Sequence, residues 1–137
     1  MKKDITELKV EDLAIAILPR EIIPVTEEED LWDVFLINLK EEPIYAVLVN
    51  SRGYGLLDGE QRRTTTLRYF WERIEPMSAV KIEPVEKSVF SLANEYWISF
   101  SFHDYLYDKK YVFVPGSLEE INFTDIPLLA RKGVMIR

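Results

Sequence analysis

The residue types that most often perform chemistry are scarce in this chain. It has one histidine, His103, and no cysteine, so thiol nucleophiles, disulfides and the usual His/Cys ligand sets of zinc are excluded. Asp104 follows His103 directly, but neighbouring strand residues point to opposite faces, so this aspartate is poorly placed to orient the imidazole as a general base. We therefore expect His103 and Asp104 to form a turn, and we predict no catalytic residue, no cofactor and no metal site.

Two other patterns resemble functional motifs but depart from them. The glycines of Gly53-Tyr54-Gly55 and Gly59 are one residue too widely spaced for a dinucleotide fingerprint, and no helix is predicted after them. The acidic run at residues 27–30 lacks the spaced aspartates of a calcium loop. Carboxylate pairs such as Glu83 with Glu86 show no spacing that would place them across a cleft. The sequence therefore favours a protein that is not an enzyme.

The charge of the chain is unevenly distributed. Residues 1–42 contain 12 acidic and 5 basic residues, whereas residues 43–137 contain 12 of each, so the whole net charge of −7 lies in the first third. A net-negative chain repels phosphate, so nucleic acid is not expected as a partner. Residues 52–73 differ, because five arginines there face three acids. The candidate anion patch in this region consists of Arg52, Arg62 and Arg63.

Hydrophobic periodicity predicts strands through most of the chain. An apolar run at 13–18 before Pro19, β-branched and aromatic residues at 64–71, and alternation at 79–85 and 96–102 each indicate a strand. A partner strand at 105–114 follows the His103-Asp104 turn. The tail predicts one last short edge strand within 126–136.

Residues 31–39 allow two interpretations. Thr26 and Glu29 match a capping box, which favours a helix, but the residues that follow are rich in strand formers. We prefer a strand that pairs with 44–49, followed by a glycine-containing loop at 50–55 and a turn at Asp58-Gly59. The number of short strands predicts an all-β, antiparallel two-sheet sandwich of immunoglobulin-like type with little helix, forming a single domain over residues 1–137.

Strand alternation assigns faces to individual side chains. In 79–85, Val80 and Ile82 are predicted to face inward, and Lys81 and Glu83 outward. In the later strand the side chains predicted to face the core are Tyr96, Ile98, Phe100 and Phe102. Trp97 then lies on the opposite, wet face, where an exposed tryptophan is a candidate interface anchor.

From about residue 31 onward the chain resembles a family of short bacterial proteins of unknown function. The resemblance rests on Glu42-Pro43, Arg52-Gly53-Tyr54-Gly55, Thr64-Thr65-Thr66-Leu67-Arg68, Asn94-Glu95-Tyr96-Trp97, Tyr107-Asp108-Lys109-Lys110 and Lys132-Gly133-Val134-Met135. Members of that family sometimes bear an automatic label as a phenylalanyl-tRNA synthetase subunit. No functional residues come with the resemblance.

Two hypotheses of function follow. The first is a non-catalytic β-sandwich that binds a protein partner or itself, with Trp97 at the interface. The second is a module related to phenylalanyl-tRNA synthetase, or one that binds a small anion, acting through the arginines of residues 52–73. Acids at positions 4, 7, 11 and 12 disfavour a signal peptide, and no apolar run is long enough to span a bilayer, so a cytoplasmic protein without membrane contact is expected.

Overall fold

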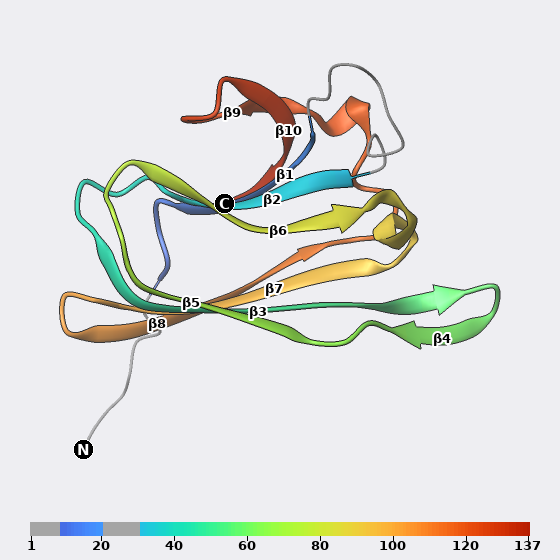
Figure 1. The fold of residues 1–137 in the computed structure, drawn as a ribbon, viewed down its shortest axis with the longest axis horizontal. Helices are drawn as coiled ribbons and strands as arrows, with labels where there is room; N and C mark the ends of the chain where they lie inside the picture. Colours follow the sequence, from blue (N-terminus) through green and yellow to red (C-terminus); the bar gives the residue numbers. More distant parts are fainter. Residues whose placement is uncertain (1–8, 21–30) are drawn as a thin grey trace.

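The computed structural model describes residues 9–20 and 31–137, which form two antiparallel β-sheets (Figure 1). The capping box at Thr26 and Glu29 and the acidic run at 27–30 lie outside the described residues. The first sheet contains, in spatial order, β6 (Ser78–Glu86), β2 (Leu31–Asn38), β1 (Leu13–Pro19), β10 (Arg131–Ile136) and β9 (Thr124–Ile126). The second contains β4 (Glu60–Arg63), β3 (Ile44–Leu57), β7 (Ala93–Phe102) and β8 (Tyr105–Phe113), with β5 (Leu67–Ile74) also paired to β3.

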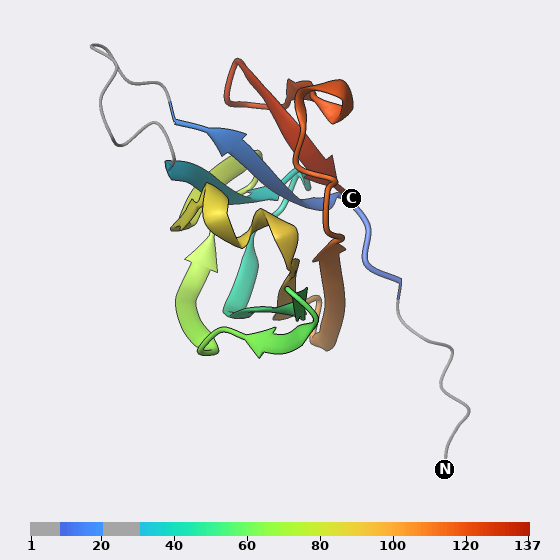
Figure 2. The ribbon, with the colours of Figure 1, turned by 90° about the vertical axis from the view of Figure 1, so that its right-hand side faces the viewer.

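The two sheets stack face to face, as the end-on view shows (Figure 2). Between strands, the helical segments of the described chain are two short 3₁₀ turns, η2 (Lys87–Ser91) and η3 (Glu120–Asn122). The predicted all-β, antiparallel two-sheet sandwich with little helix is confirmed. Among the described residues, no helix is long and apolar enough to cross a membrane.

Strand β1 explains why residues 13–18 are apolar without alternation. Its odd-numbered side chains, such as Ile15, enter the main core between the sheets. Its even-numbered side chains, such as Ala16, pack in a second cluster with Ile37 and Ile126. A strand buried on both faces needs a continuous apolar run, which is what the sequence provides.

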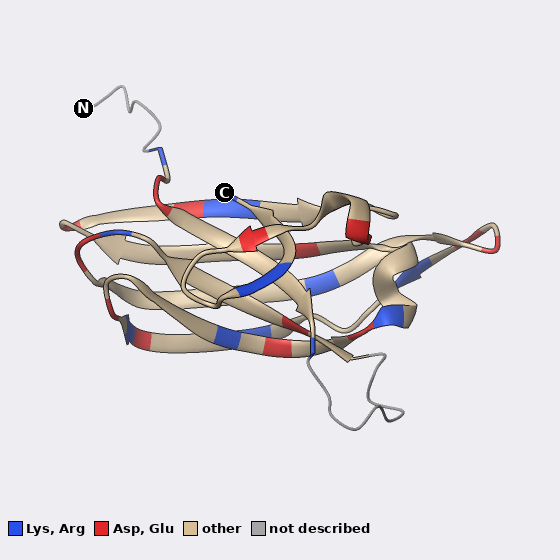
Figure 3. Ribbon diagram, turned by 90° about the horizontal axis from the view of Figure 1, so that it is seen from above, with Lys and Arg blue, Asp and Glu red and all other residues tan. Residues whose placement is uncertain are grey.

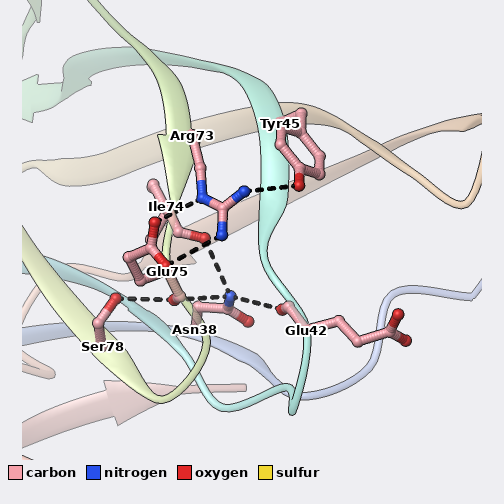
Figure 4. Close-up of polar contacts among 7 residues, drawn as sticks. All are labelled: Asn38, Glu42, Tyr45, Arg73, Ile74, Glu75 and Ser78. Carbon is pink, nitrogen blue, oxygen red and sulfur yellow. Dashed lines mark hydrogen bonds and ion pairs between the residues drawn. The ribbon is translucent and has the colours of Figure 1, made fainter.

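The predicted pairing of 31–39 with 44–49 is wrong. β2 pairs with β1 and β6, while β3 belongs to the other sheet. The connection between them crosses from one sheet to the other, and Asn38, which is fully buried, stabilises that crossing. Its Nδ2 donates hydrogen bonds to the carbonyl oxygens of Glu42 at 3.2 Å and Glu75 at 3.0 Å (Figure 4). A short connection between apolar strands does not by itself specify a hairpin.

The predicted loop at 50–55 is also wrong, because β3 continues through it to Leu57. The turn lies at Asp58-Gly59, as predicted, with φ of 53° and 79°. Both values are those of a two-residue hairpin turn with positive φ. The resulting β3–β4 hairpin projects beyond the rest of the sandwich (Figure 1).

The C-terminal strand differs from its prediction as well. β10 is not an edge strand, because it lies between β1 and β9. At Gly133 a Cβ atom would approach the carbonyl oxygen of Ile17 and the Cβ of Leu18 to 2.6 Å, so only glycine lets β10 come this close to β1. The same apolar residues could serve an edge or an interior strand, so their pattern did not distinguish the two.

Candidate functional site

The alternation of β7 separates the core from an exposed face. Tyr96, Ile98 and Phe100 are each at most 1% exposed, whereas Trp97 between them is 42% exposed. Trp97 thus lies on the outer face of the second sheet, as the sequence predicted. Its role in an interface stays a prediction.

Trp97 is one of several large apolar side chains on this outer face. Cross-strand pairing places Leu48 opposite Phe70 on β5, and Asn50 of β3 opposite Trp97. Tyr45 lies opposite Ser101, which in turn lies opposite Leu106 on β8. We call the exposed members of this face the apolar patch: Tyr45, Leu48, Phe70, Trp97 and Leu106. Large apolar side chains that gather on one face in this way mark an interaction surface more often than singly scattered ones do.

Charged side chains of both signs border the apolar patch: Arg68 and Lys110 lie in the same row as Trp97, and the exposed Asp108 lies opposite Ser99 in the next row. Glu95, next to Trp97 on β7, is only 3% exposed. Its carboxylate accepts a hydrogen bond from Arg52 Nε at 2.9 Å and one from the Tyr54 hydroxyl at 3.2 Å, and Lys110 Nζ lies 3.8 Å away. The hydrogen bond with Glu95 raises the pKa of Arg52 above its ordinary value. Lys110 also lies over the Trp97 ring, 5.0 Å from its centroid.

Two further arginines lie along β5. Arg73 donates hydrogen bonds to both carboxylate oxygens of Glu75 and to the Tyr45 hydroxyl, so it is fixed at one end of the patch (Figure 4). Arg68, opposite Asn50, makes no ion pair with another described residue. In a view from the side of the first sheet, basic and acidic positions are interspersed along the strands (Figure 3).

The predicted anion patch is only partly assembled. Arg52, Arg62 and Arg63 all line one groove of about 610 Å³ beside the β3–β4 hairpin. Arg62 lies opposite Gly55 and Arg63 opposite Tyr54, so the two neighbours project from different faces of the hairpin. Arg52 is paired with Glu95, and Arg62 Nη2 lies 3.0 Å from Glu60. Arg63 is therefore the one member of the three with no ion pair among the described residues.

The sequence interpretation missed Glu83, which it predicted to face outward. In the structure Val34 pairs with Glu83 and Phe35 with Lys81, so β6 has an extra residue, Ile82, at this point. Such a β-bulge turns the following side chain to the other face of the strand. Glu83 consequently points between the sheets, and the predicted alternation fails there. A bulge leaves no mark in a period-two pattern, and Glu83 shares its strand with Lys81 and Glu86, so nothing in the sequence singled it out.

Three hydroxyl groups hold the Glu83 carboxylate. Its Oε1 accepts hydrogen bonds from Ser51 Oγ at 2.9 Å and the Tyr69 hydroxyl at 2.7 Å, and its Oε2 accepts one from the Tyr96 hydroxyl at 2.9 Å. Burial, followed by the hydrogen bond to Glu83, raises the pKa of Tyr69 to about 12. Burial raises the pKa of Tyr96 as well. Both phenols therefore remain protonated donors at neutral pH.

A cavity of about 270 Å³ opens beside this carboxylate, between the second sheet and β6. Its lining residues belong to β3, to residues 64–65 and the first residue of β5, and to β6, η2 and β7. Apolar surface predominates, and Glu83 and Glu86 are its acidic members. Arg52 also lines it, but the guanidinium of this residue is bound to Glu95.

Nothing in the described part of the chain assembles a metal centre. No group of three or more His, Asp and Glu side chains there is placed to hold an ion. His103 forms the β7–β8 turn with Asp104, with φ of 49° and 66°, and its Nε2 lies 2.8 Å from Glu42. Comparison with family models, curated proteins and solved structures gave no match to this chain.

Proposed function

We propose that this chain is a non-catalytic binding module that docks an acidic segment of another protein on the outer face of its second sheet. The observation that carries the proposal is the apolar patch, whose members range from 36% exposed at Leu48 to 79% at Leu106. Exposed aromatic side chains are typical anchors of protein interfaces, because they bury much apolar area at little cost in conformational entropy.

The charges nearest Trp97 favour an acidic partner at that end of the patch. Arg68, Asn50, Trp97 and Lys110 form one row across the outer face, and Arg52 lies in the adjoining row. The other end is mixed, because Asp108 is exposed opposite Ser99 and Arg73 is paired with Glu75. Glu95 is buried beneath Arg52 and Lys110, so the cations and not this acid are presented to a partner. A segment whose acidic side chains meet Arg68 and Lys110 and whose apolar side chains cover Trp97, Leu48 and Phe70 complements this arrangement.

Self-association through the same face is less well supported. A two-fold dimer whose axis passes near Trp97 would bring Arg68 and Lys110 of one copy close to the same cations of the other. Like charges brought together across an interface cost free energy, so the arrangement favours a different chain as partner.

The alternative function, binding of a small anion, has little support because two of the three arginines in the candidate anion patch already form ion pairs. An anion in the groove beside the β3–β4 hairpin would compete with Glu95 for Arg52 and with Glu60 for Arg62. Arg63 alone would supply an unpaired cation from this set. One arginine at an exposed position gives little affinity for an anion.

A random peptide library displayed on phage tests the proposal. The intact chain is the bait, and the variant Phe70→Ser/Trp97→Ser is used to remove peptides that bind elsewhere. We expect enrichment of peptides that combine Asp or Glu with aromatic or aliphatic residues, and at least about tenfold weaker binding of synthetic versions to the double variant.

The matched control replaces another exposed apolar residue far from the patch. Ile121 on η3 is 88% exposed, so Ile121→Ser should leave peptide binding unchanged. Failure to enrich any peptide, enrichment of basic peptides, or equal binding to the double variant would each overturn the proposal. Concentration-dependent association of the wild-type chain that the double variant abolishes would instead assign the face to a second copy.

A further inference from the structure

The Glu83 carboxylate, which is half-buried, differs from the two acids that the fold buries. Asp33 and Glu95 are each 3% exposed, and each has two cations within 4.0 Å: Arg20 and Lys81 for Asp33, Arg52 and Lys110 for Glu95. Glu83 is turned between the sheets, yet within residues 9–20 and 31–137 it forms no ion pair. Its partners there are three neutral hydroxyls.

A carboxylate that loses part of its contact with water without gaining a countercharge costs free energy, and the cost grows with the depth of burial. Folds usually compensate with a cation or replace the acid with a neutral residue. Here the fold instead uses a β-bulge at Ile82 to turn Glu83 inward and surrounds it with hydroxyl donors. Bulges of this type recur beside binding sites, where they redirect one side chain.

The carboxylate also retains hydrogen-bonding capacity toward the cavity. An ionised carboxylate offers about four acceptor sites, two on each oxygen. Oε1 uses both of its sites, with Ser51 and Tyr69, whereas Oε2 accepts one bond, from Tyr96. One acceptor site on Oε2 is thus left without a donor in the described part of the chain, and Glu83 lines the adjoining cavity.

The cavity itself defines the rest of the ligand. Its volume of about 270 Å³ is slightly below the range of about 300–1,000 Å³ that is typical of pockets for drug-sized molecules. Leu67, Pro84, Val85 and Val89 supply apolar walls, and Glu86 adds a second acid. The site therefore suits a small molecule with one cationic donor and an apolar body.

We propose that the cavity beside Glu83 binds a small organic amine, with its ammonium group donating to Glu83 Oε2 and its apolar body against Leu67, Val85 and Val89. The ammonium supplies the countercharge that the protein does not. This site is separate from the apolar patch, because it opens between the sheets whereas the patch lies on the outer face of the second sheet.

Calorimetric titration and NMR with three probes of one shape test the charge requirement. The probes are 2-phenylethylamine, 2-phenylethanol and 3-phenylpropionate, which end in a cation, a neutral donor and an anion. We expect the amine to bind at least about tenfold more tightly than the alcohol, equivalent to about 1.4 kcal/mol, and the carboxylate not to bind. Amide signals of Ser51, Thr65 and Glu83 should shift with the amine. Absence of amine binding to the folded chain, or equal binding of all three probes, would overturn the proposal.

The variant Glu83→Gln tests the residue itself. A glutamine keeps the shape and can still bond to the three hydroxyls, but it removes the charge, so amine binding should fall at least about tenfold while alcohol binding stays the same. Glu86→Gln removes an acid at the same cavity that is not held by the three hydroxyls, and should change amine affinity much less. Unchanged amine affinity in Glu83→Gln would rule out the proposed contact.

Two further measurements keep the outcome decisive. If Glu83→Gln does not fold, Thr65→Trp, at an exposed position of the cavity lining, should block amine binding in a folded protein.

Nα-acetyl-lysine amide presents the ammonium of a protein side chain, and tighter binding of this probe than of 2-phenylethylamine would contradict a small-molecule ligand. Phe70→Ser/Trp97→Ser should bind the amine normally, so failure of this proposal and failure of peptide docking are distinguishable.

Discussion

The two faces of the second sheet treat a carboxylate in opposite ways. On the outer face Glu95 is covered by Arg52, Lys110 and Tyr54, so its charge is neutralised within the protein. On the inner face Glu83 reaches across from β6 and is held by hydroxyls alone among the described residues. The first arrangement completes an ion-pair cluster with Arg52 and Lys110 at the surface, whereas the second leaves a negative charge beside a cavity. Burial of an acid is thus not informative until its partners are known.

The largest effect should come from the inner, apolar part of this sheet. Phe100 is 1% exposed and stacks on Tyr107, with ring centroids 5.2 Å apart. Phe100→Ala should lower the free energy of unfolding by about 3–5 kcal/mol, through lost transfer energy and the cavity that remains. Urea unfolding followed by circular dichroism measures the change. A loss below about 1 kcal/mol would contradict a core position for this residue.

The two carboxylates should respond differently to the same substitution. Glu95→Gln should cost about 1 kcal/mol, the typical difference between a hydrogen bond to a charged group and one between neutral groups. Glu83→Gln should leave stability unchanged or increase it, because it removes a charge with no cation to oppose it. Thermal unfolding of the two variants side by side checks the signs. Equal destabilisation would show that the two sites are electrostatically alike.

The phenols that hold Glu83 predict a pH dependence. A phenol is neutral when protonated, so a pKa of Tyr69 raised from about 10 to about 12 stabilises the folded state while the phenol keeps its proton. This contribution is complete below pH 10 and is lost as the pH rises toward 12. Urea midpoints measured between pH 9 and pH 11 should therefore decline less in Tyr69→Phe than in the wild type. Identical pH profiles would show that Tyr69 is not perturbed by this environment.

Much of the fold could be predicted because its strands carry clear periodic patterns. The alternation of β7 correctly placed Phe100 inward and Trp97 outward, and Asp58-Gly59 and His103-Asp104 correctly marked two-residue turns. Strand partners were harder to predict, since β2 and β3 are both apolar and adjacent in sequence yet belong to different sheets. Pairing is decided by which apolar faces meet, and local pattern does not contain that information.

The two candidate sites also differ in whether the sequence could predict them. Trp97 could be found from strand parity, because the pattern around it is regular. Glu83 could not, because an extra residue at Ile82 reverses its direction without altering the composition of the strand. Its three hydroxyl partners lie on β3, β5 and β7, at separations of 32, 14 and 13 residues, and only the packing of the sheets brings them together.

The smallest effect on stability should come from Trp97, the residue between the two core positions of β7. With 42% of its surface exposed, Trp97 contributes mainly through its outer-face neighbours, including the contact with Lys110 that is worth about 0.5–1 kcal/mol at exposed sites. Trp97→Ala should therefore cost about 1 kcal/mol or less in urea unfolding, far below Phe100→Ala. A cost as large as that of Phe100→Ala would show that Trp97 is covered in solution. If that cost rose with protein concentration, the cover would be a second copy of the chain, and the outer face would be a self-association surface in place of a docking site for an acidic segment.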